Sequence, residues 1–214
     1  MTALPILIIC LGDSITAGVR PGVAEQQTYE WLLQKELSQN VRPVQIVNAG
    51  IGGERTDMAI QRLETDVIAR QPACVTLMYG TNDAAVDQGQ DKPRLPLPTY
   101  ESNLRQMVAR LREKKISPVL MTPVPLGRKL DYMAWSPYRE HGPNCVMIHY
   151  VHSVRQVALE EGVPLVDSFA VWAERALMGT DIDTLMLDGC HPNPAGQAVI
   201  AEAMYPVLAR LLRR

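Results

Sequence analysis

The sequence of 214 residues contains no long apolar run, no block of like charges and no basic stripe. A membrane-spanning helix needs about 18 to 20 consecutive apolar residues, so we expect no membrane span. Lys and Arg number 21 against 23 Asp and Glu, which gives a formal net charge of −2. Because nucleic-acid binding relies on clustered positive charge, we expect no nucleic-acid partner.

Cysteine is scarce and shows no pairing pattern. The four cysteines are Cys10, Cys74, Cys145 and Cys190, and no two of them form a Cys-x-x-Cys motif. Cys10 and Cys74 lie within apolar runs, where a cysteine usually acts as a small buried hydrophobe. Cys190 precedes a histidine and could be a nucleophile with its own base. Adjacent side chains on an extended segment point apart, which argues against that arrangement.

Histidine is also scarce, and its spacing builds no metal site. His149 and His152 lie three positions apart on one expected helix, a spacing that could hold a metal, but no Glu-x-x-His pattern or nearby cysteine completes the shell. We expect them on a solvated helix face and expect no metal. His141 is a candidate for a surface position or a substrate contact.

Two motifs of common α/β enzymes are absent. The nucleophile elbow Gly-x-Ser-x-Gly does not occur, because Thr16 stands where its last glycine would follow Ser14. No Gly-x-Gly-x-x-Gly opens the first helix, which argues against a dinucleotide cofactor.

The composition is that of an ordinary globular protein, with 47% hydrophobic and 21% charged residues. We find no internal repeat, low-complexity tract or linker, and therefore expect one domain over residues 1–214.

Apolar runs of strand length alternate with longer segments of helical periodicity. The expected strands are Ile6–Leu11, Val44–Val47, Cys74–Met78, Pro118–Met121 and Pro164–Val166. Their near-continuous apolar content is typical of a parallel sheet that is covered on both faces.

The segments between these strands have amphipathic spacing. The expected helices run along Tyr29–Leu37, the positions Ala59, Leu63 and Val67, and the ranges 100–111, 150–158 and 200–211. Asn193 before Pro194 predicts a helix start, and Gly162 predicts a helix end. The alternation predicts an α/β fold, a doubly wound three-layer α/β/α domain that binds ligands at the carboxyl ends of its strands.

Two stretches interrupt the alternation. Residues 84–98 are polar and rich in proline, and residues 122–144 form a long insertion that we expect to lie near the site. Long loops in compact domains are usually functional or disordered, and the aromatic content of this one favours order. Its amphipathic side chains are candidate substrate contacts, above all Tyr132, Trp135 and Tyr138, flanked by Arg128 and Arg139.

The candidate catalytic residues lie at the two ends of the chain. Ser14 follows the first expected strand, and Asp188 and His191 stand three positions apart in an irregular turn. A serine hydroxyl becomes a strong nucleophile when a histidine accepts its proton, and a carboxylate can fix the imidazole tautomer. The sequence therefore indicates nucleophilic hydrolysis.

Further polar segments follow the second and third expected strands. Asn48–Gly53 and Gly80–Asp83 both end at the expected ligand edge. Glycine-rich turns expose backbone N–H groups, and an asparagine amide can add another donor for a developing oxyanion.

Each of these residues also has a simpler interpretation. Ser14 could cap the following helix. Gly52, Gly53 and Asn82 could be turn formers. Asp188-Gly189 is itself a turn signal, which would make His191 an exposed loop residue.

Taken together, four blocks resemble those of the SGNH, or GDSL, hydrolase superfamily. They are Gly12-Asp13-Ser14, Asn48-Ala49-Gly50-Ile51-Gly52-Gly53, Gly80-Thr81-Asn82-Asp83 and Asp188-Gly189-Cys190-His191-Pro192-Asn193. They occur in the order found in that superfamily and span almost the whole chain. The resemblance implies a flavodoxin-like, five-stranded parallel sheet.

The resemblance also implies a role for each matching position. Ser14 would be the nucleophile, His191 the general base and Asp188 its orienting partner. The oxyanion donors would be the backbone N–H groups of Ser14 and Gly53 and the side-chain amide of Asn82. Asp13 and Asp83 would tie the loops of the site together through hydrogen bonds.

We therefore expect a serine esterase that forms an acyl-enzyme on Ser14 and needs no cofactor or metal. Its expected partner is a small-molecule ester, first of all a short-chain or acetyl ester, bound in a shallow groove. A lysophospholipase or thioesterase acting on longer chains is an alternative and would need an extended apolar channel. A non-catalytic binding module on the same scaffold is a second alternative. The sequence does not predict an oligomeric state.

The N-terminal apolar run does not have the pattern of a signal peptide. The segment Met1–Pro5 carries no Lys or Arg, and no small-residue cleavage site follows Ile6–Leu11. Cleavage after this run would also remove the proposed site. We expect a cytoplasmic protein, unless a leader is missing from this sequence.

Overall fold

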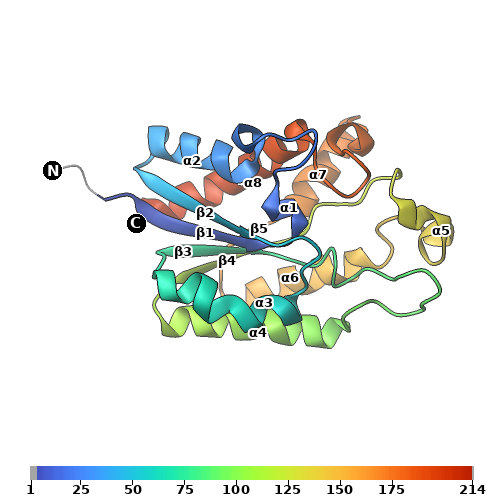
Figure 1. Cartoon of the computed structure of the whole chain (residues 1–214), viewed down its shortest axis with the longest axis horizontal. Coiled ribbons are helices and arrows are strands. Elements are labelled where there is room, and N and C mark those ends of the chain that lie inside the picture. Colours follow the sequence, from blue (N-terminus) through green and yellow to red (C-terminus); the bar gives the residue numbers. More distant parts are fainter. Residues whose placement is uncertain (1–3, 214) are drawn as a thin grey trace.

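The computed structural model describes residues 4–213 and contains one five-stranded parallel sheet, in the order β2-β1-β3-β4-β5 (Figure 1). The strands are β1 (Ile6–Gly12), β2 (Val44–Gly50), β3 (Cys74–Met78), β4 (Ser117–Met121) and β5 (Leu165–Val166). All five predicted strands are present, and the predicted doubly wound α/β fold is confirmed.

The helices form a layer on each face of this sheet. In Figure 1, α2, α7 and α8 cover one face, and α3, α4 and α6 cover the other. The larger helices are α2 (Tyr29–Asn40), α3 (Thr56–Arg62), α4 (Leu97–Glu113), α6 (Met147–Glu161), α7 (Ser168–Leu177) and α8 (Pro194–Leu212). Two single-turn helices, α1 (Ser14–Ala17) and α5 (Tyr138–His141), lie in the loops.

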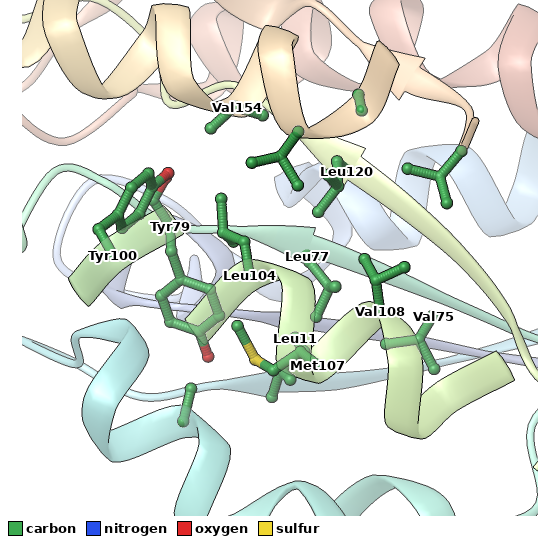
Figure 2. Packing of buried hydrophobic residues seen from close by; sticks show 14 of the residues in the cluster. Leu11, Val75, Leu77, Tyr79, Tyr100, Leu104, Met107, Val108, Leu120 and Val154 are labelled. Atoms are coloured by element: carbon green, nitrogen blue, oxygen red, sulfur yellow. The ribbon is translucent and has the colours of Figure 1, made fainter. Parts of the chain in front are cut away.

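Alternating side chains of β1 supply both halves of the core. Ile9 and Leu11 pack against α4 and α6, whereas Ile8 and Cys10 pack toward α2 and α8. This is the period of two that a strand imposes on its side chains. Figure 2 shows the first half, where Leu104, Met107 and Val108 of α4 meet the sheet. Cys10 and Cys74 are buried free thiols, as predicted.

The helix signals in the sequence are also confirmed. The side-chain oxygen of Asn193 accepts hydrogen bonds from the N–H groups of Ala195 and Gly196, which caps α8. Gly162 ends α6 in the left-handed conformation, with φ of +59°. Helix α7 was not predicted. Trp172 is fully buried, and Phe169 and Val171 pack against the core from partly buried positions, so this short amphipathic segment was simply missed in the sequence.

Two glycines allow α1 to lie directly against the carboxyl edge of the sheet. A Cβ on Gly12 would collide with the hydroxyl of Thr16, and a Cβ on Gly50 would collide with the backbone of Ala17. The close approach fixes the start of α1, where Ser14 lies, at the ends of β1 and β2.

Among residues 4–213, no helix is both long and apolar enough to cross a membrane.

Candidate active site

Ser14, His191 and Asp188 form a hydrogen-bonded series at the carboxyl edge of the sheet. The distance from Ser14 Oγ to His191 Nε2 is 3.0 Å, and the distance from His191 Nδ1 to Asp188 Oδ2 is 2.6 Å. With a proton on Nδ1, His191 donates to Asp188, and its Nε2 accepts the proton of the Ser14 hydroxyl. The fold thus brings together three residues from opposite ends of the chain.

The turn that carries His191 is itself held by Asp188. Asp188 Oδ1 accepts the backbone N–H of Cys190 at 2.9 Å and that of His191 at 2.8 Å. Partial burial acts to raise the pKa of Asp188, but the hydrogen bonds from the His191 ring and from these two N–H groups outweigh it and hold the pKa below its ordinary value. The carboxylate therefore stays ionised beside the imidazole.

Ser14 does not cap the helix that it begins. Asp13 has that role, because its Oδ1 accepts the N–H of Ile15 at 2.9 Å. The Ser14 hydroxyl faces His191 instead, so the helix-cap interpretation of Ser14 does not hold.

The three expected oxyanion donors line the same cavity as the Ser14 hydroxyl. Within residues 4–213, the backbone N–H groups of Ser14 and Gly53 donate to no other protein group. The side-chain amide of Asn82 donates to Asp13 Oδ2 and to the backbone oxygen of Glu54, both at 3.2 Å. These two long contacts orient the amide beside Ser14.

Asp13 and Asp83 connect the loops that follow β1, β2 and β3. Burial raises the pKa of Asp13 to about 7 despite the N–H groups that it accepts. Asp83 Oδ1 accepts both the N–H and the hydroxyl of Thr56, at 2.9 and 2.7 Å, and burial raises the pKa of Asp83 as well. The expected tie between loops is present in these hydrogen bonds.

A cavity of about 350 Å³ opens at Ser14. It is larger than the expected shallow groove, because the segment 122–144 forms one of its walls. Residues from that segment and from its neighbours supply the lining beyond Ser14, namely Ala84, Ala85, Arg94, Leu126, Leu130, Asp131, Tyr132, Tyr138 and Met147.

The three aromatic residues expected to contact substrate have different positions. Tyr132 and Tyr138 line the cavity, and the Tyr138 oxygen accepts the N–H of Val86 at 2.8 Å. Trp135 lies outside the lining. Its indole N–H donates to the backbone oxygen of Val86 at 3.1 Å, and its ring packs on Tyr132 with centroids 4.7 Å apart.

The wall formed by 122–144 is fastened to the turn that carries His191. The N–H of Gly127 donates to the backbone oxygen of Gly189 at 2.7 Å. Gly189 has φ of +82°, and a Cβ there would collide with the backbone nitrogen of Leu130. The shape of the cavity therefore depends on the position of the catalytic turn.

Sequence reasoning did not single out two arginines near the site. Arg20 donates to the backbone oxygens of Ser14 and Gly18; burial lowers its pKa, against the opposing effect of Asp188. Arg94 pairs with Asp87 and donates to the Tyr132 hydroxyl at 2.8 Å. Neither arginine belongs to a recognised motif. Arg20 contacts acceptors only two and six positions away, whereas Arg94 contacts Tyr132 across 38 positions.

The other candidate functional residues from the sequence, Cys190 and three further histidines, are not suited to catalysis or do not line the cavity. Burial raises the pKa of the Cys190 thiol to about 12, which disfavours a thiolate nucleophile. His149 and His152 are exposed, as predicted, and His141 is exposed and does not line the cavity. In the described part of the chain, no three Cys, His, Asp or Glu side chains are grouped to hold a metal.

Comparison with known proteins identifies the class. Residues 10–199 match the model of the GDSL-like lipase/acylhydrolase family, and the chain belongs to that family. It is a carboxylic ester hydrolase of the GDSL type.

Individual relatives are similar to this chain in sequence or in structure. An acetylxylan esterase of Geobacillus stearothermophilus is 32% identical over 75% of this chain and 70% of its own. The crystal structure of the acetylxylan esterase Axe2 from that organism superposes with a TM-score of 0.75 and 28% identity, covering 95% of this chain and 94% of its own. The isoamyl acetate-hydrolyzing esterase 1 homolog of Mus musculus is 28% identical over 94% of this chain and 80% of its own.

A further relative is a lipoprotein. The uncharacterized lipoprotein YqeF of Bacillus subtilis is 28% identical over 92% of this chain and 87% of its own.

Proposed function

We propose that Ser14 is the nucleophile of this esterase and that hydrolysis proceeds through an acyl-enzyme. The hydrogen-bonded series Ser14–His191–Asp188 at the mouth of a cavity supports this proposal most directly. In the first step, Ser14 Oγ attacks the ester carbonyl carbon while His191 Nε2 takes the hydroxyl proton. His191 then returns that proton to the departing alcohol oxygen, which leaves the acyl group on Ser14.

Water completes the reaction by the reverse sequence. His191 Nε2 takes a proton from the water that attacks the acyl carbon, and then gives this proton to Ser14 Oγ as the acid leaves. Asp188 accepts the Nδ1–H throughout and stabilises the imidazolium that forms in each half.

Negative charge on the carbonyl oxygen needs donors in place before the reaction. The unused N–H groups of Ser14 and Gly53 supply two, and the Asn82 amide supplies a third. The contacts of Asn82 with Asp13 and Glu54 are long, so an oxyanion, which is a stronger acceptor, can share these protons.

The proposed substrates are short-chain or acetyl esters. Two relatives are named for acetate esters, an acetylxylan esterase and an isoamyl acetate-hydrolyzing esterase homolog. The cavity is compact, and its polar wall contains Arg94, Asp131 and Tyr132, which suits a hydroxylated alcohol group.

Ser14→Ala and His191→Ala test the mechanism. We expect each substitution to abolish hydrolysis of 4-nitrophenyl acetate without changing the circular dichroism spectrum. A fluorophosphonate probe should label the native protein at Ser14 and leave the Ser14→Ala variant unlabelled. Wild-type activity in Ser14→Ala would refute the mechanism, and unlabelled native protein would revive the non-catalytic binding module.

A panel of esters tests the substrate class. We expect kcat/KM to be highest for acetyl and butyryl esters and for acetylated sugars, and to fall for acyl chains of eight carbons or more, measured in the same buffer. A strong preference for the long chains would favour the lysophospholipase or thioesterase alternative.

A cytoplasmic location stays a prediction, because one of the relatives is a lipoprotein. Cell fractionation of the source organism, with detection of this chain, would decide it.

A further inference from the structure

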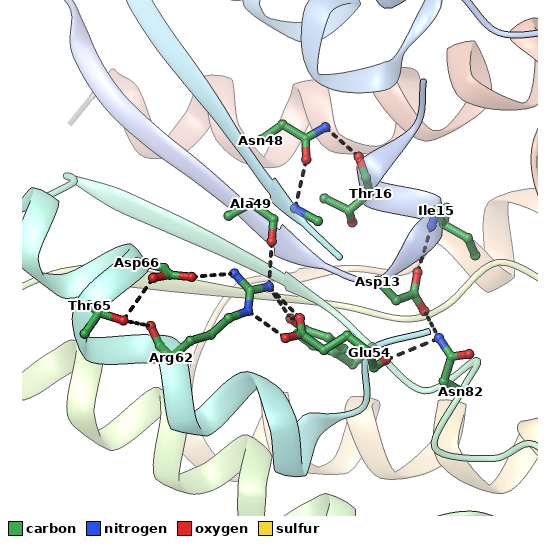
Figure 3. Close-up of polar contacts among 12 residues, drawn as sticks. Asp13, Ile15, Thr16, Asn48, Ala49, Glu54, Arg62, Thr65, Asp66 and Asn82 are labelled. Atoms are coloured by element: carbon green, nitrogen blue, oxygen red, sulfur yellow. Dashed lines mark hydrogen bonds and ion pairs between the residues drawn. The ribbon is translucent and has the colours of Figure 1, made fainter. Parts of the chain in front are cut away.

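A buried ion pair lies directly beneath the turn that carries Gly53. Glu54 is 2% exposed, and its carboxylate accepts two hydrogen bonds from the Arg62 guanidinium, the one from Nε at 2.6 Å (Figure 3). The hydroxyl of Tyr79 donates to the same carboxylate at 2.7 Å. Glu54 therefore has three charged or polar donors although it is closed off from solvent.

The guanidinium of Arg62 connects three elements of the fold. Besides Glu54, it donates to the backbone oxygen of Ala49 at 2.7 Å and pairs with Asp66 at 3.3 Å. Ala49 belongs to β2, Arg62 ends α3, and Tyr79 directly follows β3. The pair thus holds the turn between β2 and α3 to the rigid sheet.

The backbone of Glu54 connects this pair to the proposed oxyanion donors. Glu54 follows Gly53 directly, and its N–H donates to the backbone oxygen of Ile51 at 3.2 Å, which closes the turn. Its backbone oxygen accepts the Asn82 amide at 3.2 Å. A shift of Glu54 would therefore move the N–H of Gly53 and release the amide of Asn82 together.

Stability alone does not account for this arrangement. Desolvating two charges offsets most of their mutual attraction, so apolar residues of similar size often serve at least as well. Catalysis by fixed dipoles, in contrast, depends on donor positions to within a fraction of an ångström.

We propose that Glu54 and Arg62 are positioning residues that hold Gly53 and Asn82 in the geometry needed to bind the oxyanion. This inference rests on the proposed function, in which Gly53 and Asn82 are the donors. Neither Glu54 nor Arg62 lines the cavity, so we expect the effect on kcat rather than on KM.

Glu54→Gln is the first test, because it keeps the shape of the side chain and removes its charge. Removing an oxyanion donor costs about a hundredfold or more in kcat, so we expect displaced donors to cost about tenfold, with KM changed less than about twofold. The matched control is Glu160→Gln, which breaks an exposed ion pair with Arg105 between α4 and α6 and should keep wild-type kcat.

Removal of one charge from a buried pair can unfold a protein. The variant Glu54→Gln/Arg62→Gln leaves no buried charge unpaired, since Asp66, which also loses its contact with Arg62, is exposed to solvent. We expect this variant to fold and to show the same loss of kcat. If both variants unfold, Tyr79→Phe decides the question, since it removes one hydrogen bond to Glu54 and should lower kcat by about twofold to fivefold. Wild-type kcat in every variant that folds would overturn the proposal.

A double-mutant cycle with Asn82→Ala separates positioning from a general structural effect. If Glu54 acts through the donors, Glu54→Gln should cost clearly less in the Asn82→Ala background than in the native protein. Fully additive effects on kcat would overturn the proposal even if Glu54→Gln is impaired. The proposed function fails separately, namely if Ser14→Ala keeps its activity.

Discussion

The imidazole of His191 is held between two partners, and the proposed mechanism needs both contacts at once. Asp188 orients the ring through Nδ1, and the turn that joins the two residues is closed by the same carboxylate. The Asp188 side chain is 55% exposed, so solvent can replace part of its effect. We therefore expect substitution of Asp188 to lower kcat without abolishing activity.

Asp188→Asn should lower kcat by about 10²- to 10⁴-fold with little change in KM, because the amide no longer imposes a proton on Nδ1 of His191. The control is Asp57→Asn, which breaks a surface pair with Arg55 and should leave kcat at the wild-type value. Steady-state kinetics on an acetyl ester measures both. Wild-type kcat in Asp188→Asn would show that His191 is oriented by other groups.

Gly189→Ala should destabilise the protein by about 1 to 3 kcal/mol, because φ of +82° is unfavourable for alanine and its Cβ would collide with Leu130. Thermal unfolding measures the loss. We also expect a fall in kcat, since the turn that carries His191 must shift.

Gly179→Ala is the matched control for that prediction. Gly179 has φ of +97°, but a Cβ there would meet nothing within 4 Å. The difference between the two variants therefore isolates the collision with Leu130. Equal loss of stability in both would contradict a packed contact between the wall and the catalytic turn.

At the scale of elements, α2 carries a buried acid that makes stability depend on pH. Glu30 is 8% exposed; one carboxylate oxygen accepts the Asn48 amide, and the other has no partner in the described structure. Burial raises its pKa from 4.5 to about 7, although hydrogen bonds, among them the one from Asn48, oppose the shift. The folded state therefore holds a proton between these two pH values that the unfolded state has released.

Stability should accordingly fall as pH rises from about 4.5 to about 7, because folding must then take up a proton. Glu30→Gln should reduce this slope and make the variant more stable than the native protein above pH 7, by up to about 3 kcal/mol. Urea unfolding at pH 4.5, 6 and 8 measures it. An unchanged slope would contradict a raised pKa for Glu30.

The segment 122–144 supplies a wall of the cavity. Trp135 does not line the cavity itself but packs against Tyr132, which does. Trp135→Ala should raise KM about threefold to tenfold with little change in kcat, because Tyr132 loses one of its two aromatic neighbours while Ser14 is untouched. Trp31→Ala is the control and should leave KM unchanged, because Trp31 is a half-buried residue of α2 that does not line the cavity. A loss of kcat alone would show that this segment serves the reaction rather than substrate binding.

At the scale of the whole molecule, both helix layers pack on one sheet. The two halves of the core share β1, through Ile9 and Leu11 on one face and Ile8 and Cys10 on the other. Neither helix layer can separate from the sheet without exposing apolar side chains of β1 to solvent.

We therefore expect residues 1–214 to unfold as one cooperative unit, as a single domain does. Far-UV circular dichroism and tryptophan fluorescence, which reports on Trp31, Trp135 and the buried Trp172, should give the same urea midpoint. Separate midpoints would contradict a single domain.

The sequence alone determined the alternation of strands and helices, and with it the layers and the edge that carries the site. Prediction of these elements succeeded because the sequence signals for them are local. The apolar runs of β1 and β3, the cap at Asn193 and the stop at Gly162 each act within a few residues of themselves. The four sequence blocks of the family pointed to Ser14, Gly53, Asn82 and His191 in the same way.

Only the tertiary structure decided how those residues meet and what supports them. The 3.0 Å contact between Ser14 and His191 joins positions 177 residues apart, and no local pattern encodes a distance of that kind. Arg20, Arg94 and the pair Glu54–Arg62 were not predicted, although some of their partners are near in sequence, because a charged side chain has no periodic signal of its own. The contacts of Arg94 with Tyr132 and of Glu54 with Tyr79 and Asn82 join residues 25 or more positions apart, and these contacts form only when the sheet has assembled.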